Sequence, residues 1–255
     1  MIFFKSLKFK ILLVGISLSI VLSLVLSVFI YEYLKKSYTE KQIEYTAFNL
    51  QLIMNNIEKE YIQIMRFGSA LSNKESIHSF LTYDGKATKN EAYLQISAFK
   101  AAQNQFLNAP LAKNIEKCMI FSDRGVHIQL GMKYGHETDF NYRFSQNLKE
   151  NQIKVHGIVD SPYFYFPNEK IIPISVPIYS TIGSKRIGWA DIIVNTNLIT
   201  EYIPDEVFEG GSRLFIIIED NMYEILKSHI SDKLTETKVP MDYTLRPLSN
   251  NIFLL

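Results

Sequence analysis

The stretch VPIYSTIGSKRIGWADIIVN, residues 176–195, decides the fold. Two apolar runs flank a polar segment that contains Gly183. Apolar runs of this length favour strands, and a short polar segment with glycine between them favours a turn. We therefore predict a hairpin of two core strands, residues 171–179 and 187–195. Pro173 and Pro177 lack a backbone donor, so the first strand is expected near a sheet edge or at a bulge.

Two more hairpins are predicted on either side of this stretch. One begins with an apolar run at residue 115, turns at Asp123-Arg124-Gly125 and continues with alternating apolar residues to Leu130. The other joins residues 214–218 to residues 223–226 and follows the flexible pair Gly210-Gly211. Because the two hairpins have the same form, we predict a second unit of strands after the first.

A long helix is predicted before the strands, over residues 32–81. This segment contains no proline and a single glycine. Apolar residues in its second half follow the 3-4 spacing of a helix seam, and a further apolar set widens the stripe in the first half. Such a seam can pack along its own domain, meet a partner helix in a homodimer, or do both. The seam is Leu50, Ile53, Ile57, Tyr61, Ile64, Gly68 and Leu71, and the further set is Tyr45, Phe48 and Leu52.

Three shorter helices are also predicted. An amphipathic helix covers residues 93–107 and ends before Pro110. Residues 139–151 can form a short helix, and another begins near residue 197 with Thr196 or Asn197 as its cap. Helices combined with antiparallel hairpins predict an α+β fold.

The amino-terminal segment is predicted to anchor the chain in a membrane. Residues 11–31 carry no charge, and a helix of this length spans roughly 31 Å, the thickness of a bilayer core. A cleaved signal peptide is the alternative, but its apolar region would be about 7–15 residues long with a small-x-small site at its end. Lysines are nearly balanced on the two sides of the span. Because the short tail need not be exported, residues 1–10 are expected in the cytoplasm and residues 32–255 outside the cell.

The composition excludes several functions. Lys and Arg number 27 against 26 Asp and Glu, so no nucleic-acid surface is predicted. Cys118 is the only cysteine, which excludes an intramolecular disulfide and a cysteine-based zinc site. No nucleophile-elbow, zinc-protease or phosphate-loop motif occurs, and the five histidines are scattered. We therefore predict no catalytic residue, cofactor or metal in these residues; whether the chain belongs to a larger enzyme stays open.

The order of these elements resembles the double Cache extracellular sensor region of a bacterial transmembrane receptor, most closely one of the sensor histidine kinase class. The matching pieces are the strand PISVPIYS, the G-x-x-x-I-G turn that ends at Gly188, the strand WADIIVN, and the helix near Leu198. The resemblance implies a PAS-like antiparallel sheet in a membrane-distal domain, residues 82–208, and a partial membrane-proximal PAS-like unit, residues 209–255.

This resemblance also implies a function. The chain would bind a small ligand outside the cell and transmit a signal across the membrane, and a kinase catalytic domain would lie beyond Leu255. The alternatives are the sensor half of a membrane-bound transcription regulator or of a chemoreceptor, a surface-anchored binding protein without signalling output, and an external enzyme.

In this family the ligand pocket lies between the sheet and its covering loops. The resemblance therefore suggests Arg143 as the partner of a carboxylate and the rings of Tyr163 and Tyr165 as stacking surfaces. Trp189 and Asp191 follow on the strand after the glycine turn. Each has a plainer interpretation: the tyrosines as an aromatic edge strand, the tryptophan as core, and the aspartate as a solvated strand residue.

The kind of ligand is not predicted. The amino-acid-binding members of the family are expected to carry an aspartate where this chain has Ile193. Asp191 lies two residues earlier, and the two side chains should face the same side of the strand. This departure argues against an amino-acid ligand.

Overall fold

The computed structural model of the chain describes residues 7–84, 91–109, 113–123, 126–131, 143–149, 152–163, 169–180, 185–205, 207–208, 213–218, 221–227, 229–233, 246–249 and 252–254. The chain divides into two compact units, Met1–Leu52 and Ile53–Leu255. Helix α1, Leu7–Ser72, begins in the first unit and ends in the second.

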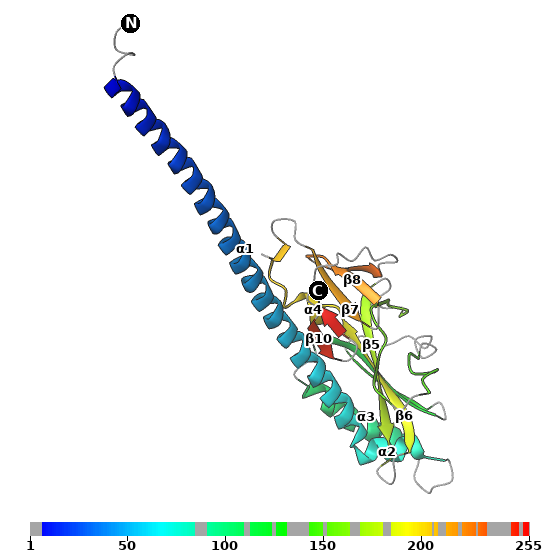
Figure 1. Cartoon of the computed structure of the whole chain (residues 1–255). Coiled ribbons are helices and arrows are strands. Elements are labelled where there is room, and N and C mark those ends of the chain that lie inside the picture. The colour runs from blue at the N-terminus through cyan, green and yellow to red at the C-terminus, as the bar shows by residue number, and fades with distance from the viewer. Residues whose placement is uncertain are drawn as a thin grey trace. The chain divides into compact units, whose positions relative to one another are not determined.

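The first unit consists of the amino-terminal part of α1 (Figure 1). Its side chains from Ile11 to Ile30 are exposed and uncharged, and the helix is long and apolar enough to cross a membrane. Ser17 and Ser27 donate their hydroxyl groups to the carbonyl oxygens of Val14 and Ser23. These bonds satisfy the polar groups of an apolar helix within the helix itself. The predicted continuity between the apolar segment and the long helix is confirmed.

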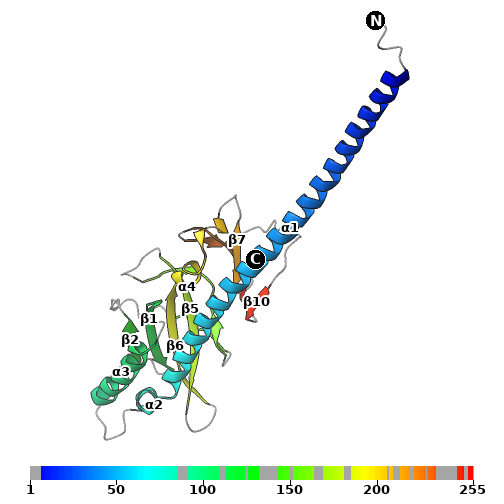
Figure 2. The same ribbon diagram turned by 90° about the vertical axis from the view of Figure 1, so that its left-hand side faces the viewer.

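In the second unit, α1 is followed by α2, Glu75–Thr82, and α3, Glu91–Leu107. The prediction of one helix up to residue 81 is wrong, because α1 ends at Ser72 and Lys74 adopts an extended backbone (φ −90°, ψ 116°). The ring of His78 in α2 hydrogen-bonds the carbonyl oxygen of Ser72, which ties α2 to the end of α1. Helix α2 packs against α3, and α3 lies along β2 (Figure 2).

The first sheet is antiparallel and contains both hairpins predicted in this region. Its strand order is β2-β1-β6-β5-β3, and β4 also pairs with β5. The predicted strand near a sheet edge is β5, which lies next to the short strands β3 and β4 and has a register shift at its end. The bounds are β1 Ile115–Ser122, β2 His127–Gly131, β3 Lys154–Val155, β4 Val159–Asp160, β5 Lys170–Tyr179 and β6 Arg186–Asn195.

The carboxy-terminal part of α1 covers one face of this sheet. A Cβ atom added to Gly68 would lie 2.8 Å from Val176 of β5, so only glycine allows this approach without displacing the valine. The predicted seam supports this packing, since Ile53, Ile57, Ile64 and Leu71 are all buried. The seam residues from Ile53 to Leu71 thus serve the domain's own core. Strands β5 and β6 lie beside this part of α1 in the ribbon diagram (Figure 1).

The second sheet follows the short helix α4, Asn197–Thr200, whose cap residue Thr196 makes no side-chain capping bond. Its order is β10-β11-β7-β8-β9. The predicted third hairpin is confirmed as β7 and β8, and the Tyr223 hydroxyl of β8 bonds both the N–H and the carbonyl oxygen of Ile158, each at 3.2 Å. The bounds are β7 Leu214–Ile218, β8 Asn221–Ile225, β9 Ile230–Lys233, β10 Arg246–Ser249 and β11 Ile252–Leu254.

Candidate functional site

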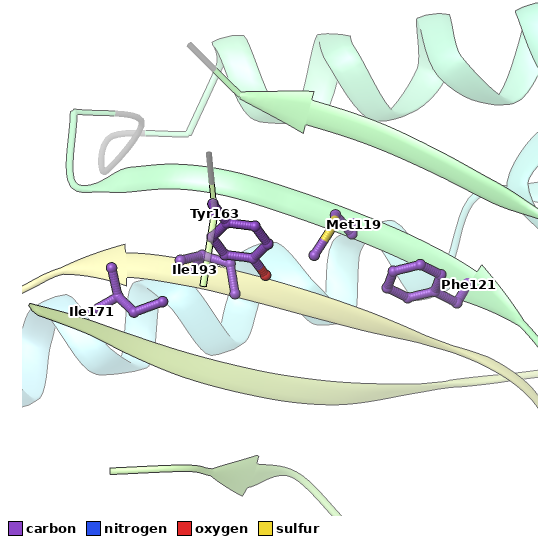
Figure 3. Packing of buried hydrophobic residues seen from close by; sticks show 5 residues of the cluster. All are labelled: Met119, Phe121, Tyr163, Ile171 and Ile193. Carbon is purple, nitrogen blue, oxygen red and sulfur yellow. The ribbon is translucent and has the colours of Figure 1, made fainter. Parts of the chain in front are cut away.

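The candidate site is the face of the first sheet that α1 does not cover. Val176 meets α1 and pairs with Ala190, so the next residue of β6, Asp191, points to the opposite face. Asp191 stands between Met119 of β1 and Ser175 of β5 in the strand register. A buried cluster occupies this face: Met119, Phe121, Tyr163, Ile171 and Ile193 (Figure 3).

Asp191 is fully buried and held by hydroxyl and amide donors. The Ser175 hydroxyl donates to Oδ1 at 2.7 Å. Ser145 donates twice to Oδ2, from its backbone N–H at 3.2 Å and from its hydroxyl at 3.1 Å. Both serines are themselves buried. The carboxyl group is therefore enclosed by two neutral side chains, one from the sheet and one from the segment that covers it.

Burial raises the pKa of the Asp191 carboxyl above its usual 3.8. Hydrogen bonds from Ser175, from Ser145 and from the Phe144 backbone oppose this rise, but desolvation has the larger effect. A carboxylate removed from water is costly unless a cation or enough hydrogen-bond donors compensate it. The environment of Asp191 is thus one in which an added positive charge would be stabilising.

The covering segment, residues 143–149, places Ser145 over the sheet. We predicted a short helix here, but the described part consists of turns, in which Gln146 N–H bonds Arg143 O and Leu148 N–H bonds Ser145 O. Phe144 packs against the buried cluster, and its ring centroid lies 5.5 Å from that of His156. The segment is therefore attached to the sheet face through Phe144, Ser145 and Arg143, whose guanidinium lies over the Phe121 ring.

His156 extends the polar chain toward the second sheet. Its Nε2 lies 2.9 Å from the Ser175 hydroxyl oxygen. Because the Ser175 hydroxyl donates to Asp191, its oxygen is left to accept a hydrogen bond from His156. Two residues later, Ile158 is held by Tyr223 of β8. Hydrogen bonds thus link Asp191 to His156, and the backbone leads from His156 to Ile158, which Tyr223 of the second sheet holds.

Lys117 of β1 is a buried cation on the same face. Its side chain is fully buried, and Nζ lies 4.4 Å from the ring centroid of Tyr163. A cation over an aromatic face is attracted by the ring's electron density, more strongly when water is excluded. The sheet face therefore carries a lysine and an aspartate within two residues of register on neighbouring strands.

The structure brings four of the five predicted site residues to this region. Tyr163 is only 1% exposed and lies beside Ile193 and Met119 (Figure 3), and the Arg143 guanidinium lies 4.6 Å from the Phe121 ring centroid. Trp189 pairs with Phe121 in the register, and the Arg186 guanidinium stacks 4.8 Å from its ring. Asp191 is at the centre of the polar contacts. Tyr165 lies outside the described residues.

Sequence reasoning missed the residues that contact Asp191 and Tyr163. Ser175 and Lys117 are polar residues inside otherwise apolar strand runs, which is a usable signal because a buried polar side chain needs a partner. Ser145 and His156 lie outside the predicted strands, and nothing in their spacing points to Asp191. Their proximity depends on how the chain returns over the sheet.

Hollows also lie elsewhere in the described part of the chain. Among the described residues, no group of three or more His, Cys, Asp or Glu side chains could hold a metal ion. A hollow of about 380 Å³ lies between α3 and β2, and one of about 460 Å³ lies near α4 and Lys227. Neither is lined by a predicted site residue that the structure describes, so the sheet face remains the candidate.

The comparison with solved structures identifies the fold. The chain is similar to the sensory domain of the Campylobacter jejuni chemoreceptor Tlp3 (CcmL) with isoleucine bound, with 13% identity, a TM-score of 0.51, and coverage of 74% of this chain and 72% of that one. It is also similar to the ligand-binding domain of Tlp3 in complex with L-valine, with 13% identity, a TM-score of 0.50, and coverage of 72% and 71%. No family model and no curated protein sequence matches the chain.

The fold is therefore that of double Cache-type sensor domains of bacterial chemoreceptors. The expected α+β architecture, in which a long apolar amino-terminal helix precedes antiparallel sheets, is confirmed. At 13% identity the likeness concerns the fold alone.

Proposed function

We propose that the chain is a membrane-anchored extracellular sensor that binds a small molecule on the sheet face around Asp191. The observation that supports this most is the fully buried Asp191 carboxyl, whose hydrogen-bond donors are two serines and backbone amides. A ligand with a cationic amino group would place a positive charge directly beside this carboxyl, whose hydrogen-bond donors in the structure are neutral. The aromatic rings of Tyr163 and Phe144 would cover its apolar part.

Ligand binding would also change the covering segment. Ser145 occupies Oδ2 of Asp191 with both of its donors, so a ligand ammonium group that takes this oxygen would release Ser145. Residues 143–149 would then move relative to the sheet, and Ser175 and His156 would carry the change toward Tyr223. A ligand can shift such an equilibrium only by binding one arrangement better than the other.

The ligand class that fits this face is a small primary amine, with amino acids among its members. The Tlp3 structures were determined with isoleucine and with L-valine. In this chain Ile193 stands at the position where an aspartate was expected, but it lies on the same face as Asp191. Asp191 would therefore take the role of amine acceptor from the neighbouring position on that face.

The output of the receptor is proposed in two forms. The fold likeness to chemoreceptor sensory domains favours a chemoreceptor, and the sequence resemblance favours a sensor histidine kinase. In either form residues 11–31 would span the membrane, residues 1–10 would be cytoplasmic, and residues 82–208 and 209–255 would form membrane-distal and membrane-proximal units. The receptor would act as a homodimer through the long helix.

A set of matched probes tests the ligand class on the full chain in detergent micelles. L-valine carries both charges, isobutylamine only the positive one, and isovalerate only the negative one. We expect L-valine and other primary amines to raise the melting temperature, with isovalerate having no effect. A higher melting temperature with isovalerate alone would contradict the proposed role of Asp191. A broad panel of amines in which none raises the melting temperature would contradict it as well.

A further inference from the structure

One outer edge of the first sheet is formed by β2. Among the strands that the structure describes, β2 pairs only with β1. The opposite edge is formed by β3 and β4, which have only two residues each. Short strands, charged residues and prolines are the usual means by which proteins prevent a sheet edge from pairing with another chain. Since β2 has five residues and contains no proline, lysine or acidic residue, its edge is able to accept a further strand.

The strand register shows which backbone groups of β2 point outward. The Ser122 N–H donates to the Val126 carbonyl oxygen at 2.8 Å, so these two residues form a hydrogen-bonded pair of the hairpin. In an antiparallel ladder, hydrogen-bonded and non-hydrogen-bonded pairs alternate along the strands. Gln129 lies three positions further along the ladder, in a non-hydrogen-bonded pair. The N–H and C=O groups of Gln129 therefore point away from β1, and those of His127 and Gly131 point the same way.

The hollow of about 380 Å³ between α3 and β2 lies beside this edge, and we call it the α3–β2 groove. Helix α3 lies along β2 (Figure 2). The lining of the groove includes Gln129 and Ile128 from β2 and Ile96 and Phe99 from α3. Ile96 is 55% exposed, whereas Ile128 is buried in the sheet. The groove therefore offers apolar surface directly beside backbone groups that point outward from the sheet.

The helix side of the groove belongs to an exposed stripe of α3 that extends beyond the hollow in both directions. Its members recur at alternating steps of 3 and 4 residues and are all exposed: Tyr93, Ile96, Lys100, Gln103 and Leu107. From end to end the stripe spans roughly 21 Å, at 1.5 Å per helical residue. An extended strand covers this distance with about six residues. The helix face thus matches in length the strand that could pair with β2.

We propose that the α3–β2 groove binds an extended, acidic peptide segment that joins the first sheet as a further strand beside β2. The backbone of the segment hydrogen-bonds the outward-pointing groups of Gln129 and its neighbours, and every second side chain enters the groove against Ile96 and Phe99. In strand addition of this kind, the main-chain bonds supply affinity and the pockets for alternate side chains supply specificity. A helix has its own backbone groups paired internally and cannot make these bonds.

The charge of the groove favours an acidic segment over a basic one. Lys100 carries a positive charge, and none of the described residues that line the groove is Asp or Glu. The remaining helix residues of the lining, Gln95 and Gln103, are neutral. Lys100 can therefore pair with a carboxylate of the bound segment and repels a lysine or arginine at the same place. The groove contains no residue of the face around Asp191, so this proposal does not rest on the proposed function.

Matched peptides test strand addition on the full chain in detergent micelles, with fluorescence anisotropy as the measurement. The reference peptide alternates valine and glutamate, carries a fluorescent label at its amino end and is amidated at its carboxyl end. One variant peptide is N-methylated on every valine and another on every glutamate. Because an edge strand presents the N–H groups of alternate residues to its neighbour, we expect one N-methylated peptide to bind like the reference and the other to bind about tenfold more weakly or worse. A peptide with glutamine in place of glutamate should bind several-fold more weakly than the reference.

Substitutions in the groove locate the binding site. Gln129→Pro removes the outward N–H and leaves the bonds to β1 in place, since proline is tolerated where the N–H of an edge strand faces away from the sheet. We expect this variant to bind the reference peptide about tenfold more weakly or worse. Gln129→Ala is the matched control, because it loses the side chain but keeps the backbone donor, and it should bind like wild type. Ile96→Ala should weaken binding several-fold through the loss of apolar contact.

Three results would overturn the proposal: no binding of the reference peptide at millimolar concentration, equal affinity of the two N-methylated peptides, or wild-type affinity of Gln129→Pro. If Gln129→Pro fails to fold, Ile96→Ala and the N-methylated pair decide the question. The labelled and amidated peptides carry no amino group, so we expect Asp191→Asn to bind them like wild type. The peptide experiment and the amine experiment can therefore fail independently of each other.

Discussion

Burial of the Asp191 carboxyl group destabilises the folded protein when the group is ionised. Its folded-state pKa lies above the unfolded value of 3.8, so protonation favours the folded state. The corresponding stability is fully present below the unfolded pKa and is lost as the pH rises through the folded pKa. Ser175 and Ser145 reduce this cost through their hydrogen bonds without removing it.

We therefore expect Asp191→Asn to stabilise the protein relative to wild type at neutral pH, with the advantage shrinking as the pH falls toward the unfolded pKa. Asparagine has nearly the same shape and carries no charge to desolvate. Melting temperatures of both proteins across the acidic to neutral range measure the difference. Parallel curves would show that the carboxyl group does not titrate as its burial requires.

At this scale the sequence predicts that Asp191 and Ile193 share one side of a strand, but not which residues contact them. Strand alternation is enough to place Asp191 and Ile193 on one side of β6. The contact with Ser145 joins residues 46 positions apart through a turn segment, and no local pattern contains that information. The plainer interpretation of Asp191 as a solvated strand residue is wrong, because its side chain is fully buried.

At the scale of the elements, the packing of α1 against β5 requires a close approach between Gly68 and Val176. The 2.8 Å contact that a Gly68 side chain would make involves Val176, a stiff β-branched residue. Overpacking costs about 1–3 kcal/mol, and replacing glycine by alanine within a helix gains about 1 kcal/mol. The two effects oppose each other, and the first is expected to be larger.

We predict that Gly68→Ala destabilises the protein by about 1 kcal/mol in the wild-type background and stabilises it in a Val176→Ala background. The second variant removes the methyl groups that cause the clash, so only the helix gain remains. A double-mutant cycle from chemical unfolding measures the coupling between the two positions. Additive effects would mean that α1 and β5 are not packed as described.

The elements themselves were largely predictable, because hairpins and amphipathic helices are local patterns. β1 with β2, β5 with β6, and β7 with β8 all follow from apolar runs joined by turn residues. The break between α1 and α2 was not predictable, since Asn73 and Lys74 are neither proline nor glycine. At the break, the His78 ring bonds the carbonyl oxygen of Ser72, and the Ser72 hydroxyl donates to the carbonyl oxygen of Pro177 at 3.4 Å, a contact 105 residues away along the chain.

At the scale of the whole molecule, the candidate ligand site and the second sheet belong to the same compact unit, Ile53–Leu255. The fold is shared with double Cache-type sensor domains, and the polar contacts lead from the candidate ligand site to the second sheet. The order of the units along the chain was predictable from the repeated hairpin form. The path between them was not, because Tyr223 and Ile158 are 65 residues apart.

Calorimetric titration of the full chain with the amine that stabilises it most tests the central claim directly. We expect Asp191→Asn to weaken binding by about tenfold or more, the loss of a charged hydrogen bond, while remaining folded. Asp160→Asn serves as the control, because the side chain of Asp160 is 69% exposed and pairs with Lys170, the first residue of β5. Equal affinity of wild type and Asp191→Asn would contradict the account.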